Sequence, residues 1–408
     1  MTEFKVIIGR AGTGKTEYAK RVAKKCIREN KTVYCLSFTH SAVNNMKSRN
    51  FPPECKFSTL HSFFRISPAG TILGCYRKVD VLIIDEFSLI DGEMLVKCVH
   101  SLKKLNNFVT IYLFGDILQL GTIRQSELIE YSSLQELLSV IPYQNLQPAS
   151  LVKIIKHVQG LCINNPFIMK NIVKSITLTE NHRSNELVST MVDFIVFKDD
   201  KTLVRDNIID INQVLKNIRS GWTFIASSYS ILSKINSRLK TRDSINFFNW
   251  YLEPDSTVYS TVNTDRIYNG EHLTFKEFSN GLLILEKTDG ERFAISEFPS
   301  DKVPIVLPSN IYTFHKSQGL EFDNVIVCID DLFEFPMLYT GITRARNSVK
   351  FFSFNASTDN NSDLQTGSSV LWTAGCTGCP CTCEDLQTGS HEIAVLSEMY
   401  KEGVKITP

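Results

Sequence analysis

The sequence predicts an α/β protein organised around parallel β-sheets in two successive domains. Short apolar runs rich in valine and isoleucine alternate with segments of helical periodicity over residues 1–120. This alternation is typical of βαβ units. A second strand-rich series follows after residue 176. The length of 408 residues also exceeds what one hydrophobic core usually holds, which favours two domains.

The first domain is expected over residues 1–175. Apolar runs predict buried strands at residues 4–8, 32–38, 79–84 and 109–114, and residues 15–29 place their apolar side chains on one face of a helix. Each predicted strand ends in polar residues, and parallel sheets carry their sites at the carboxyl ends of the strands. Residues 121–175 have a helical pattern without a catalytic cluster, so we expect a helical insertion there.

The second domain is expected over residues 176–356, with strands at 222–227, 324–330 and 348–354. Residues 255–305 interrupt it with alternating apolar and polar residues and three Asn-Gly or Asp-Gly turn sequences. This pattern predicts a small, mostly antiparallel β module inserted into the domain. Residues 357–408 are rich in serine, threonine, asparagine and glycine and repeat the hexapeptide Asp-Leu-Gln-Thr-Gly-Ser. We expect a loosely ordered low-complexity tail.

The composition argues against a membrane-spanning or disulfide-rich secreted protein. No apolar stretch approaches the roughly 18 residues that a membrane helix needs. The start of the chain lacks the apolar core of a signal peptide, so an intracellular, soluble protein is expected. The net charge of +1 neither requires nor excludes a nucleic-acid partner, so any basic groove has to be local.

The eleven cysteines fall into two groups. Seven are scattered through apolar segments, where reduced, buried thiols are expected. The other four, Cys376, Cys379, Cys381 and Cys383, crowd together ahead of His391. A zinc site is one interpretation of this cluster. Structural zinc sites usually separate two ligand pairs by a longer loop, which favours the alternative of a flexible thiol-bearing tail.

The segment Gly9-Arg-Ala-Gly-Thr-Gly-Lys-Thr16 predicts a phosphate-binding loop, because it follows an apolar strand and opens an amphipathic helix. Backbone N–H groups of such a loop close around phosphates, and the helix N-terminus adds partial positive charge. Lys15 is expected to reach the β- and γ-phosphates and the Thr16 hydroxyl to bind Mg²⁺. The predicted contacts of this loop with the cofactor come from Gly9, Ala11, Gly12, Thr13, Gly14, Lys15 and Thr16.

A pair of acidic residues completes this predicted pocket. The apolar run Val81-Leu-Ile-Ile delivers Asp85 and Glu86 at its carboxyl end. Asp85 is expected to hold the magnesium ion, as the aspartate after such a strand does in P-loop NTPases. Glu86 is placed to polarise an attacking water, which favours hydrolysis over transfer to a small-molecule acceptor.

Seven segments in order resemble the motifs of superfamily 1 helicases. They are residues 37–46 (motif Ia, in a Rep/UvrD-like form), 58–64 (Ib, similar to the Pif1 group), 85–91 (II, similar to Pif1 and RecD), 115–120 (III), 178–184 (IV), 313–321 (V) and 339–346 (VI). With the phosphate-binding loop, the resemblance covers roughly residues 5–355. The chain resembles the Pif1/RecD-like group most closely, with some Rep/UvrD-like features.

The resemblance implies an α/β fold of two RecA-like P-loop NTPase domains, with ATP between them and a small SH3-like β insertion in the second. By position, Gln119 would sense the γ-phosphate, and Arg183 and Arg344 would reach it from the second domain. Arginines across a cleft stabilise the charge that develops during phosphoryl transfer. Gly319 and Glu321 would lie beside the nucleotide, with Glu321 on the ribose.

The same motifs supply candidates for binding a single strand. Hydroxyl groups and a cation suit phosphate contacts, and aromatic rings suit stacking on bases. The candidates are Phe38, Thr39, Thr59, His61, Phe64, Thr313, His315 and Lys316. Phe38 and Phe64 fit equally well as core aromatics, and the two histidines as structural hydrogen-bonding residues.

The expected function is therefore an ATP-dependent helicase or translocase on single-stranded nucleic acid, with DNA favoured and RNA left open. The position of the insertion between motifs IV and V favours movement in the 5′→3′ direction. A nucleic-acid-stimulated ATPase with little unwinding, a P-loop small-molecule kinase and a clamp without turnover are the alternatives. The glutamine motif that reads adenine is absent upstream of Gly9, so the base preference is expected to be loose.

Overall fold

The computed structural model describes residues 2–67, 70–74, 77–102, 108–121, 157, 161–180, 182, 186–193, 202–262, 264, 266–296, 305–330 and 335–354. Arg183, most of the predicted helical insertion at 121–175 and the tail with its cysteines lie outside these residues. Among the described helices, none combines the length and apolar character needed to cross a membrane.

The first lobe is a six-stranded parallel sheet in the order β3-β2-β4-β5-β1-β6. Its strands are β1 (Thr2–Gly9), β2 (Val33–Ser37), β3 (Lys56–Thr59), β4 (Val81–Ile84), β5 (Val109–Gly115) and β6 (Ile172–Leu178). The four predicted strands are confirmed. The predicted boundary between residues 175 and 176 is wrong, because β6 crosses it and pairs with β1 along its length. The first lobe therefore continues at least to Leu178.

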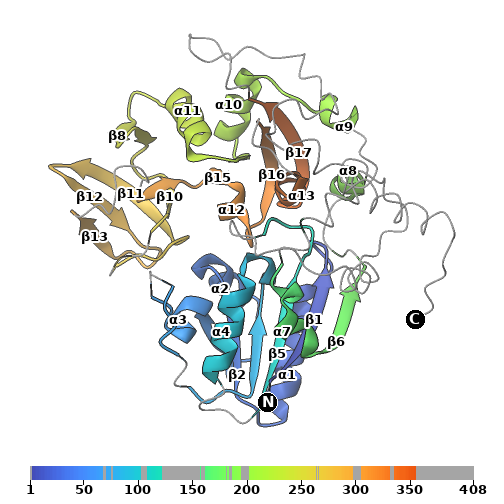
Figure 1. The fold of residues 1–408 in the computed structure, drawn as a ribbon. Coiled ribbons are helices and arrows are strands. Elements are labelled where there is room, and N and C mark those ends of the chain that lie inside the picture. Colours follow the sequence, from blue (N-terminus) through green and yellow to red (C-terminus); the bar gives the residue numbers. More distant parts are fainter. Residues whose placement is uncertain are drawn as a thin grey trace, which may run out of the picture.

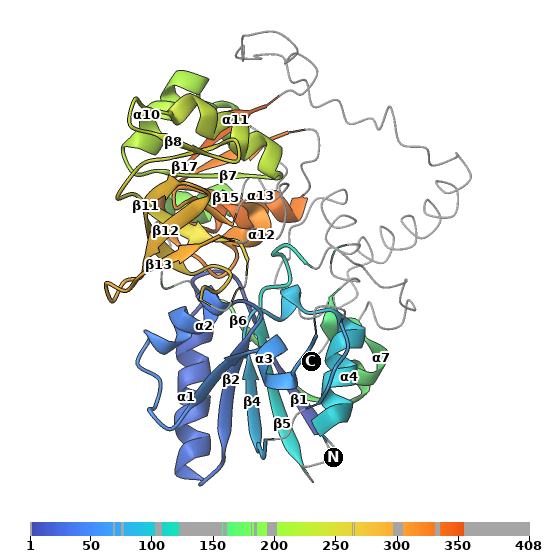
Figure 2. The same ribbon diagram turned by 90° about the vertical axis from the view of Figure 1, so that its left-hand side faces the viewer.

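Helices cover both faces of this sheet, as Figure 2 shows with α1 on one side and α4 and α7 on the other. The helices of the lobe are α1 (Lys15–Arg28), α2 (His40–Lys47), α3 (Leu60–Phe64), α4 (Gly92–Leu102) and α7 (Pro166–Lys170), with 3-10 turns η1 (Phe87–Leu89) and η2 (Cys162–Asn164). α1 buries Ala19, Ala23 and Cys26 against alternate residues of the strands, such as Ile7 and Ile83. The period-two alternation of the strands gives each face of the sheet its own apolar layer.

The second lobe is a four-stranded parallel sheet in the order β15-β7-β16-β17. Its strands are β7 (Thr223–Ala226), β15 (Ile311–Thr313), β16 (Phe322–Ile329) and β17 (Ala345–Ser353). Its helices are α8 (Glu186–Met191), α9 (Thr202–Arg205), α10 (Ile211–Arg219), α11 (Tyr229–Leu239), α12 (Phe314–Ser317) and α13 (Phe335–Ile342). The predicted α/β character of this half is confirmed.

A separate antiparallel β module interrupts the second lobe, as the turn sequences predict. Its five strands are β10 (Thr257–Ser260), β11 (His272–Ser279), β12 (Leu282–Glu286), β13 (Arg292–Ile295) and β14 (Val306–Pro308), in the order β13-β12-β11-β10-β14. It has its own apolar core. The sheet runs three residues past the predicted end at 305, and its likeness to an SH3 domain stays a prediction. The hairpin of β8 (Ile245–Phe247) and β9 (Trp250–Leu252) precedes it. In Figure 1 the module projects beside the second lobe, above α2 and α3 of the first.

Candidate nucleotide cleft and strand-binding edge

One cleft lies between the two lobes, and both contribute to its walls. The first lobe supplies the phosphate-binding loop, α2 and the ends of β4 and β5, and the second supplies motifs V and VI. The lining residues are Ala11, Gly12, Gly14, Lys15, Thr16, Glu17, Ala42, Asn45, Met46, Arg49, Asp85, Glu86, Gln119, His182, Gly319, Leu320, Glu321 and Arg344. The sequence-predicted site residues of five separate motifs thus meet in one place.

The phosphate-binding loop has the tight geometry that its glycines predict. A Cβ at Gly9 would collide with the Thr13 hydroxyl, and Gly14 adopts a left-handed conformation (φ 79°) where the loop enters α1. Lys15 Nζ donates to the carbonyl oxygens of Gly9 and Arg10 at 2.6 and 2.9 Å. The lysine therefore lies over the loop, with its ammonium group where phosphate oxygens would bind.

The two carboxylates lie at the floor of the cleft, where β4 ends. Withdrawal from water and the neighbouring charge of Glu86 raise the pKa of Asp85 to about 7, against the opposing effect of Lys15 and Arg49. Glu86 is in the left-handed region (φ 57°), and its Oε2 is buried without a hydrogen-bond partner among the described residues. An unpaired buried carboxylate oxygen is costly unless it meets a water, a cation or a ligand.

Motif III is held to the second lobe by a buried hydrogen-bonded clasp. Tyr339 donates its hydroxyl to Asp116 Oδ2 at 2.7 Å. The Leu120 N–H donates to Thr340 Oγ1 at 2.9 Å, and Gln318 Nε2 donates to the Leu120 carbonyl at 2.5 Å. Gln119, one residue before, is 2% exposed and lines the cleft, with its Oε1 unpaired in the described structure. Its side chain thus sits between the nucleotide cleft and the contact of the two lobes.

Arg344 reaches the cleft from the second lobe, as the resemblance predicts. The residue is 4% exposed, and its guanidinium group donates to the carbonyls of Thr340 and Leu320 and to the Thr343 hydroxyl, all at 3.2–3.3 Å. These neutral partners leave its positive charge without a carboxylate among the described contacts. An anion in the cleft would supply the missing partner.

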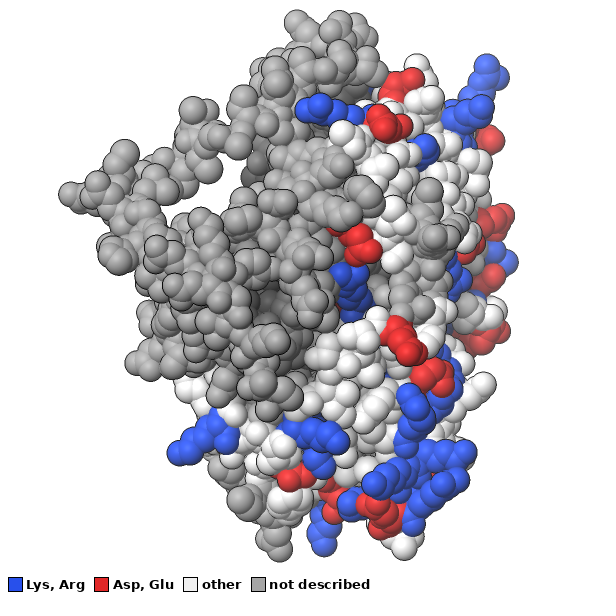
Figure 3. Space-filling view, turned by 90° about the vertical axis from the view of Figure 1, so that its right-hand side faces the viewer, with Lys and Arg blue, Asp and Glu red and all other residues white. Residues whose placement is uncertain are grey.

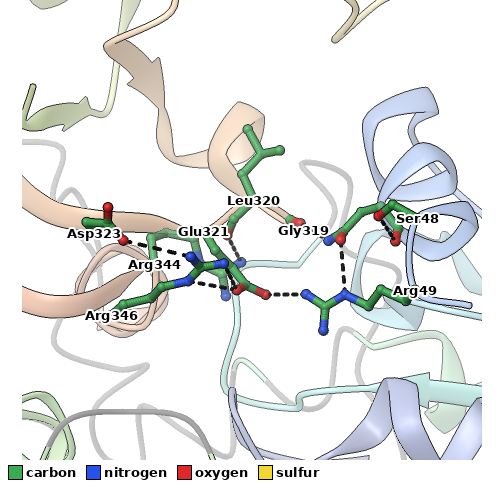
Figure 4. A network of polar contacts seen from close by, with 9 residues as sticks. Ser48, Arg49, Gly319, Leu320, Glu321, Asp323, Arg344 and Arg346 are labelled. Carbon is green, nitrogen blue, oxygen red and sulfur yellow. Dashed lines mark hydrogen bonds and ion pairs between the residues drawn. The ribbon is translucent and has the colours of Figure 1, made fainter.

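Glu321 forms an ion pair across the cleft that the sequence did not predict. Its carboxylate accepts from Arg49 Nη2 of the first lobe at 2.8 Å and from Arg346 Nη2 at 2.9 Å. Figure 4 shows the three side chains in line. Arg49 Nε also donates to Asn45 Oδ1 at 3.1 Å. Asn45 donates to the carbonyl of Gly319, whose own Cβ position would be 3.3 Å from Ala42. The two lobes therefore touch closely along α2, and the proposed ribose contact of Glu321 competes with Arg49.

Sequence reasoning missed three residues of this site. Arg49 lies just after α2, two residues past its last residue Lys47, and belongs to no sequence motif. His182 donates its backbone N–H to the Gly12 carbonyl at 2.9 Å and places its ring against Gly14. His157 comes from the segment between motifs III and IV, is 6% exposed, and its Nε2 lies 2.7 Å from the Gln119 carbonyl. Only His182, which directly precedes the motif IV arginine, stood in a segment already singled out.

The three threonines predicted for the single strand occupy equivalent positions. Each one caps the helix that follows a strand: Thr39 accepts from Ala42 N, Thr59 from Ser62 N and Thr313 from Lys316 N. Thr59 and Thr313 are the last residues of their strands, and Thr39 lies two residues past the end of β2. As acceptors, their hydroxyls keep a proton available for donation to another group. Since β2, β3 and β15 are parallel-sheet strands, these caps lie at the carboxyl edges of the two sheets.

The two aromatic candidates for base stacking differ in exposure. Phe64 is fully buried and packs edge-on against Phe63 at 4.9 Å between ring centroids. The prediction that Phe64 stacks on a base is wrong, because none of its ring reaches the surface. Phe38 is partly buried, with its ring edge-on to His61 at 5.0 Å, so the two form one surface element.

Burial lowers the pKa of His61 and of His315, so both rings are neutral near pH 7. Burial also lowers the pKa of Lys316 to about 8. Its Nζ donates to Asn269 Oδ1 at 2.5 Å, and no acidic partner faces it in the described part of the chain. A buried ammonium group without a carboxylate is suited to bind a phosphate.

Figure 3 shows one face of the molecule, on which basic side chains gather at the lower end, over the first lobe and among acidic residues. The outward face of α1 in the same lobe carries a cluster of exposed basic residues, Arg21, Lys24, Lys25 and Arg28. The last turn of α1 lies at the far end from the phosphate-binding loop (Figure 1). This cluster is a solvated helix face.

The donor set of the cleft fits a magnesium ion. The Thr16 hydroxyl and the Asp85 and Glu86 carboxylates all line it, and Mg²⁺ takes oxygen ligands from one or two carboxylates together with phosphates. Elsewhere in the described residues, no group of three histidine, cysteine or acidic side chains is placed to hold a metal. Six of the scattered cysteines are described, and all are free and buried as predicted.

Two family models match the chain. Residues 1–124 match the model described as an AAA domain, and residues 308–350 match the UvrD-like helicase C-terminal domain. The first covers the phosphate-binding loop through motif III, and the second covers motifs V and VI. The two matches thus fall on the two walls of the cleft.

Two curated relatives are RecD subunits of the RecBCD enzyme. The Haemophilus influenzae protein is 22% identical over 86% of this chain and 66% of its own length. The Buchnera aphidicola protein is 23% identical over 67% of this chain and 54% of its own length. The chain therefore spans less than two thirds of these relatives.

Solved structures of Pif1 helicases share the fold. Pif1 in a study of forked duplex DNA has a TM-score of 0.58 at 20% identity, covering 86% of this chain and 87% of its own. Candida albicans Pif1 has a TM-score of 0.57 at 17% identity, covering 88% and 92%. Bacteroides Pif1 bound to single-stranded DNA has a TM-score of 0.55 at 19% identity, covering 86% and 88%. Taken with the two-walled cleft, these findings show that the chain has the fold of the Pif1 helicase structures, with its two family-model matches on the two lobes.

Proposed function

We propose that this chain is an ATP-dependent helicase or translocase that moves along single-stranded DNA. One observation carries the proposal. The phosphate-binding loop, the Asp85–Glu86 pair and Gln119 of the first lobe face Arg344 of the second across a single cleft. A small-molecule kinase does not need motifs V and VI, whereas a motor uses the motif VI arginine to couple lobe closure to the nucleotide.

The residues of the cleft have distinct roles in the proposed hydrolysis. Lys15 and the backbone of residues 9–16 bind the β- and γ-phosphates, and Thr16 and Asp85 hold magnesium. Magnesium supplies charge neutralisation at the phosphate oxygens. Glu86 orients the attacking water and accepts its proton, which fits its unpaired Oε2. Gln119 and Arg344 contact the γ-phosphate, with Arg183 proposed as a second arginine.

The strand is proposed to bind across the carboxyl edges of both sheets. Thr39 and Thr59 of the first lobe and Thr313 with Lys316 of the second donate to phosphates, and Phe38 with His61 offers an aromatic surface. Contacts of this kind follow the backbone and do not read sequence. The clasp joins Asp116 and Leu120 of the first lobe to Tyr339 and Thr340 of the second. It would link the nucleotide state to the distance between the strand contacts of the two lobes.

The relatives support DNA as the partner. The Bacteroides Pif1 structures with this fold include one bound to single-stranded DNA and one in complex with ADP-AlF3 and single-stranded DNA, the latter with a TM-score of 0.53. We propose 5′→3′ movement from the place of the β module between motifs IV and V. RNA is the second candidate substrate, since phosphate contacts through hydroxyl groups distinguish the two sugars weakly.

Unwinding of tailed duplexes tests the proposal. Fluorophore-labelled duplexes with a 5′ or a 3′ single-stranded tail, of DNA and of RNA, are mixed with protein, ATP and Mg²⁺. We expect strand separation of the 5′-tailed DNA duplex. Preference for the 3′ tail would contradict the proposed direction. Activity on RNA alone would contradict DNA as the substrate. If a strand stimulates ATP hydrolysis but no duplex is separated, the result would support a translocase that does not unwind duplexes.

A further inference from the structure

We propose that Tyr268, at the tip of a turn in the inserted β module, is a base-stacking residue that closes over the single strand. The inference rests on the proposed function and adds a contact from outside the helicase motifs. It starts from the position of the tyrosine: its ring stacks on His40, the first residue of α2, with 4.6 Å between centroids and 26° between planes. The module thereby reaches back to the first lobe.

The turn that carries Tyr268 is rigid and is anchored at both ends. The Glu271 N–H donates to the Tyr268 carbonyl at 2.9 Å, and the Tyr268 N–H donates to Glu271 Oε2 at 2.8 Å. Gly270 has a φ of 84°, which favours glycine, and its N–H donates to the carbonyl of Ser260 at 2.7 Å. A ring held in this way loses little conformational entropy when a ligand stacks on it.

The same turn contacts motif V. Asn269, the next residue, accepts from Lys316 Nζ at 2.5 Å. His40 follows Thr39, the proposed phosphate contact of the first lobe, and Lys316 lies three residues from Thr313, that of the second. Tyr268 and Asn269 therefore bridge the two proposed halves of the strand path. Both views place the module beside α2 (Figures 1 and 2).

The tyrosine ring is available to a base. Despite the stack on His40, 51% of the residue is exposed, more than for the exposed aromatic residues Phe108 (47%) and Phe248 (41%). Burial lowers the pKa of His40, so the imidazole ring is neutral and adds a second flat surface without charge. One nucleotide would make both contacts, with its phosphate near Lys316 and its base stacked on the Tyr268 ring.

Strand binding by matched variants tests this role. Affinity for a fluorescein-labelled oligodeoxythymidine is measured by anisotropy for the full chain and for Tyr268→Ala, Tyr268→Phe and Phe108→Ala. Phe108 is 47% exposed and precedes β5, at the opposite edge of the first sheet, so it is the matched control. We expect Tyr268→Ala to raise the Kd about 5- to 100-fold. Tyr268→Phe and Phe108→Ala should leave the Kd unchanged.

Photocrosslinking separates direct stacking from a structural effect. The unaltered protein is irradiated with an oligonucleotide that contains 5-iododeoxyuridine, and mass spectrometry locates the linked peptide. We expect a crosslink on Tyr268. A weakened Tyr268→Ala without this crosslink would show a structural role only, and unchanged affinity of Tyr268→Ala would also overturn the inference. If the unaltered chain binds no strand at all, the proposed function fails and the inference with it.

Discussion

At the residue scale, the cleft contains polar groups that the rest of the protein leaves unsatisfied. Glu86 Oε2 and Gln119 Oε1 are buried without partners in the described structure, and Arg344 bonds only to neutral oxygens. Such groups are costly to bury, and in a cleft that both lobes line a ligand would complete their contacts. Both carboxylates and the arginine were found from the sequence because they stand at fixed places in motifs.

Removal of the Glu86 charge should separate nucleotide binding from hydrolysis. Glu86→Gln keeps the size of the side chain but cannot accept a proton from water. We expect the kcat for ATP to fall about 10²- to 10⁴-fold with little change in KM. Steady-state ATPase assays measure both constants. A kcat close to that of the unaltered chain would exclude Glu86 as the base.

Lys316 predicts a pH dependence of strand binding. Its pKa is lowered to about 8, so the ammonium form prevails below that pH and the neutral amine above it. Only the ammonium form pairs with a phosphate. Affinity for single-stranded DNA at constant salt should therefore fall between pH 7 and pH 9, as measured by anisotropy. In Lys316→Arg, whose guanidinium group stays charged, this fall should vanish; a persistent fall would assign it to another group.

Phe64 illustrates where residue-level prediction fails. The motif gave it a role at the strand, but the structure buries it against Phe63. We expect Phe64→Ala to lower the free energy of unfolding by about 3–5 kcal/mol. Phe108→Ala, at an exposed site, should change it by less than about 0.5 kcal/mol. Urea unfolding followed by circular dichroism compares the two; equal stabilities would contradict the buried position of Phe64.

At the element scale, one local arrangement recurs in both lobes. A threonine at the end of a strand, or just after it, caps the next helix: β2 and α2, β3 and α3, β15 and α12. The cap stabilises the helix and at the same time places a hydroxyl at the edge of the sheet. The sequence predicted the residues because the motifs contain them, but not the shared geometry, which depends on where each strand ends.

The clasp between motifs III and VI is the element that should couple the two sites. In Tyr339→Phe, the buried Asp116 loses a hydrogen-bond donor at 2.7 Å, at a cost of about 1–3 kcal/mol. We expect basal ATPase activity to be retained and its stimulation by single-stranded DNA to fall, since the lobes then respond less to the strand. ATPase rates at saturating and zero strand give the ratio. An unchanged ratio would mean that the clasp is structural only.

At the scale of the whole molecule, the sequence predicted the two parallel sheets and the inserted β module. Apolar runs found most strands of the first sheet, because buried parallel strands read as continuous apolar segments. β6 was not predicted, because its residues are half-exposed or exposed; Val173, for example, is 58% exposed. The domain boundary was misplaced as a result. The Arg49–Glu321 pair was not predicted for a different reason: its partners are 272 residues apart and only the assembled fold brings them together.

The contacts of the β module were also beyond prediction from the sequence. Its turns were predicted from Asn-Gly and Asp-Gly sequences, yet its contact with α2 through Tyr268 and His40 could not be read from either segment alone. Contacts between distant elements follow from the assembled fold. The same holds for His157, whose ring bonds to the Gln119 carbonyl from the long segment between motifs III and IV.

ATP turnover with and without single-stranded DNA tests most directly whether the cleft hydrolyses ATP to drive movement along a strand. We predict that oligodeoxythymidine raises the turnover rate and that Lys15→Ala abolishes turnover under both conditions. No stimulation by DNA or RNA, or phosphate transfer to a small acceptor in place of water, would contradict this function.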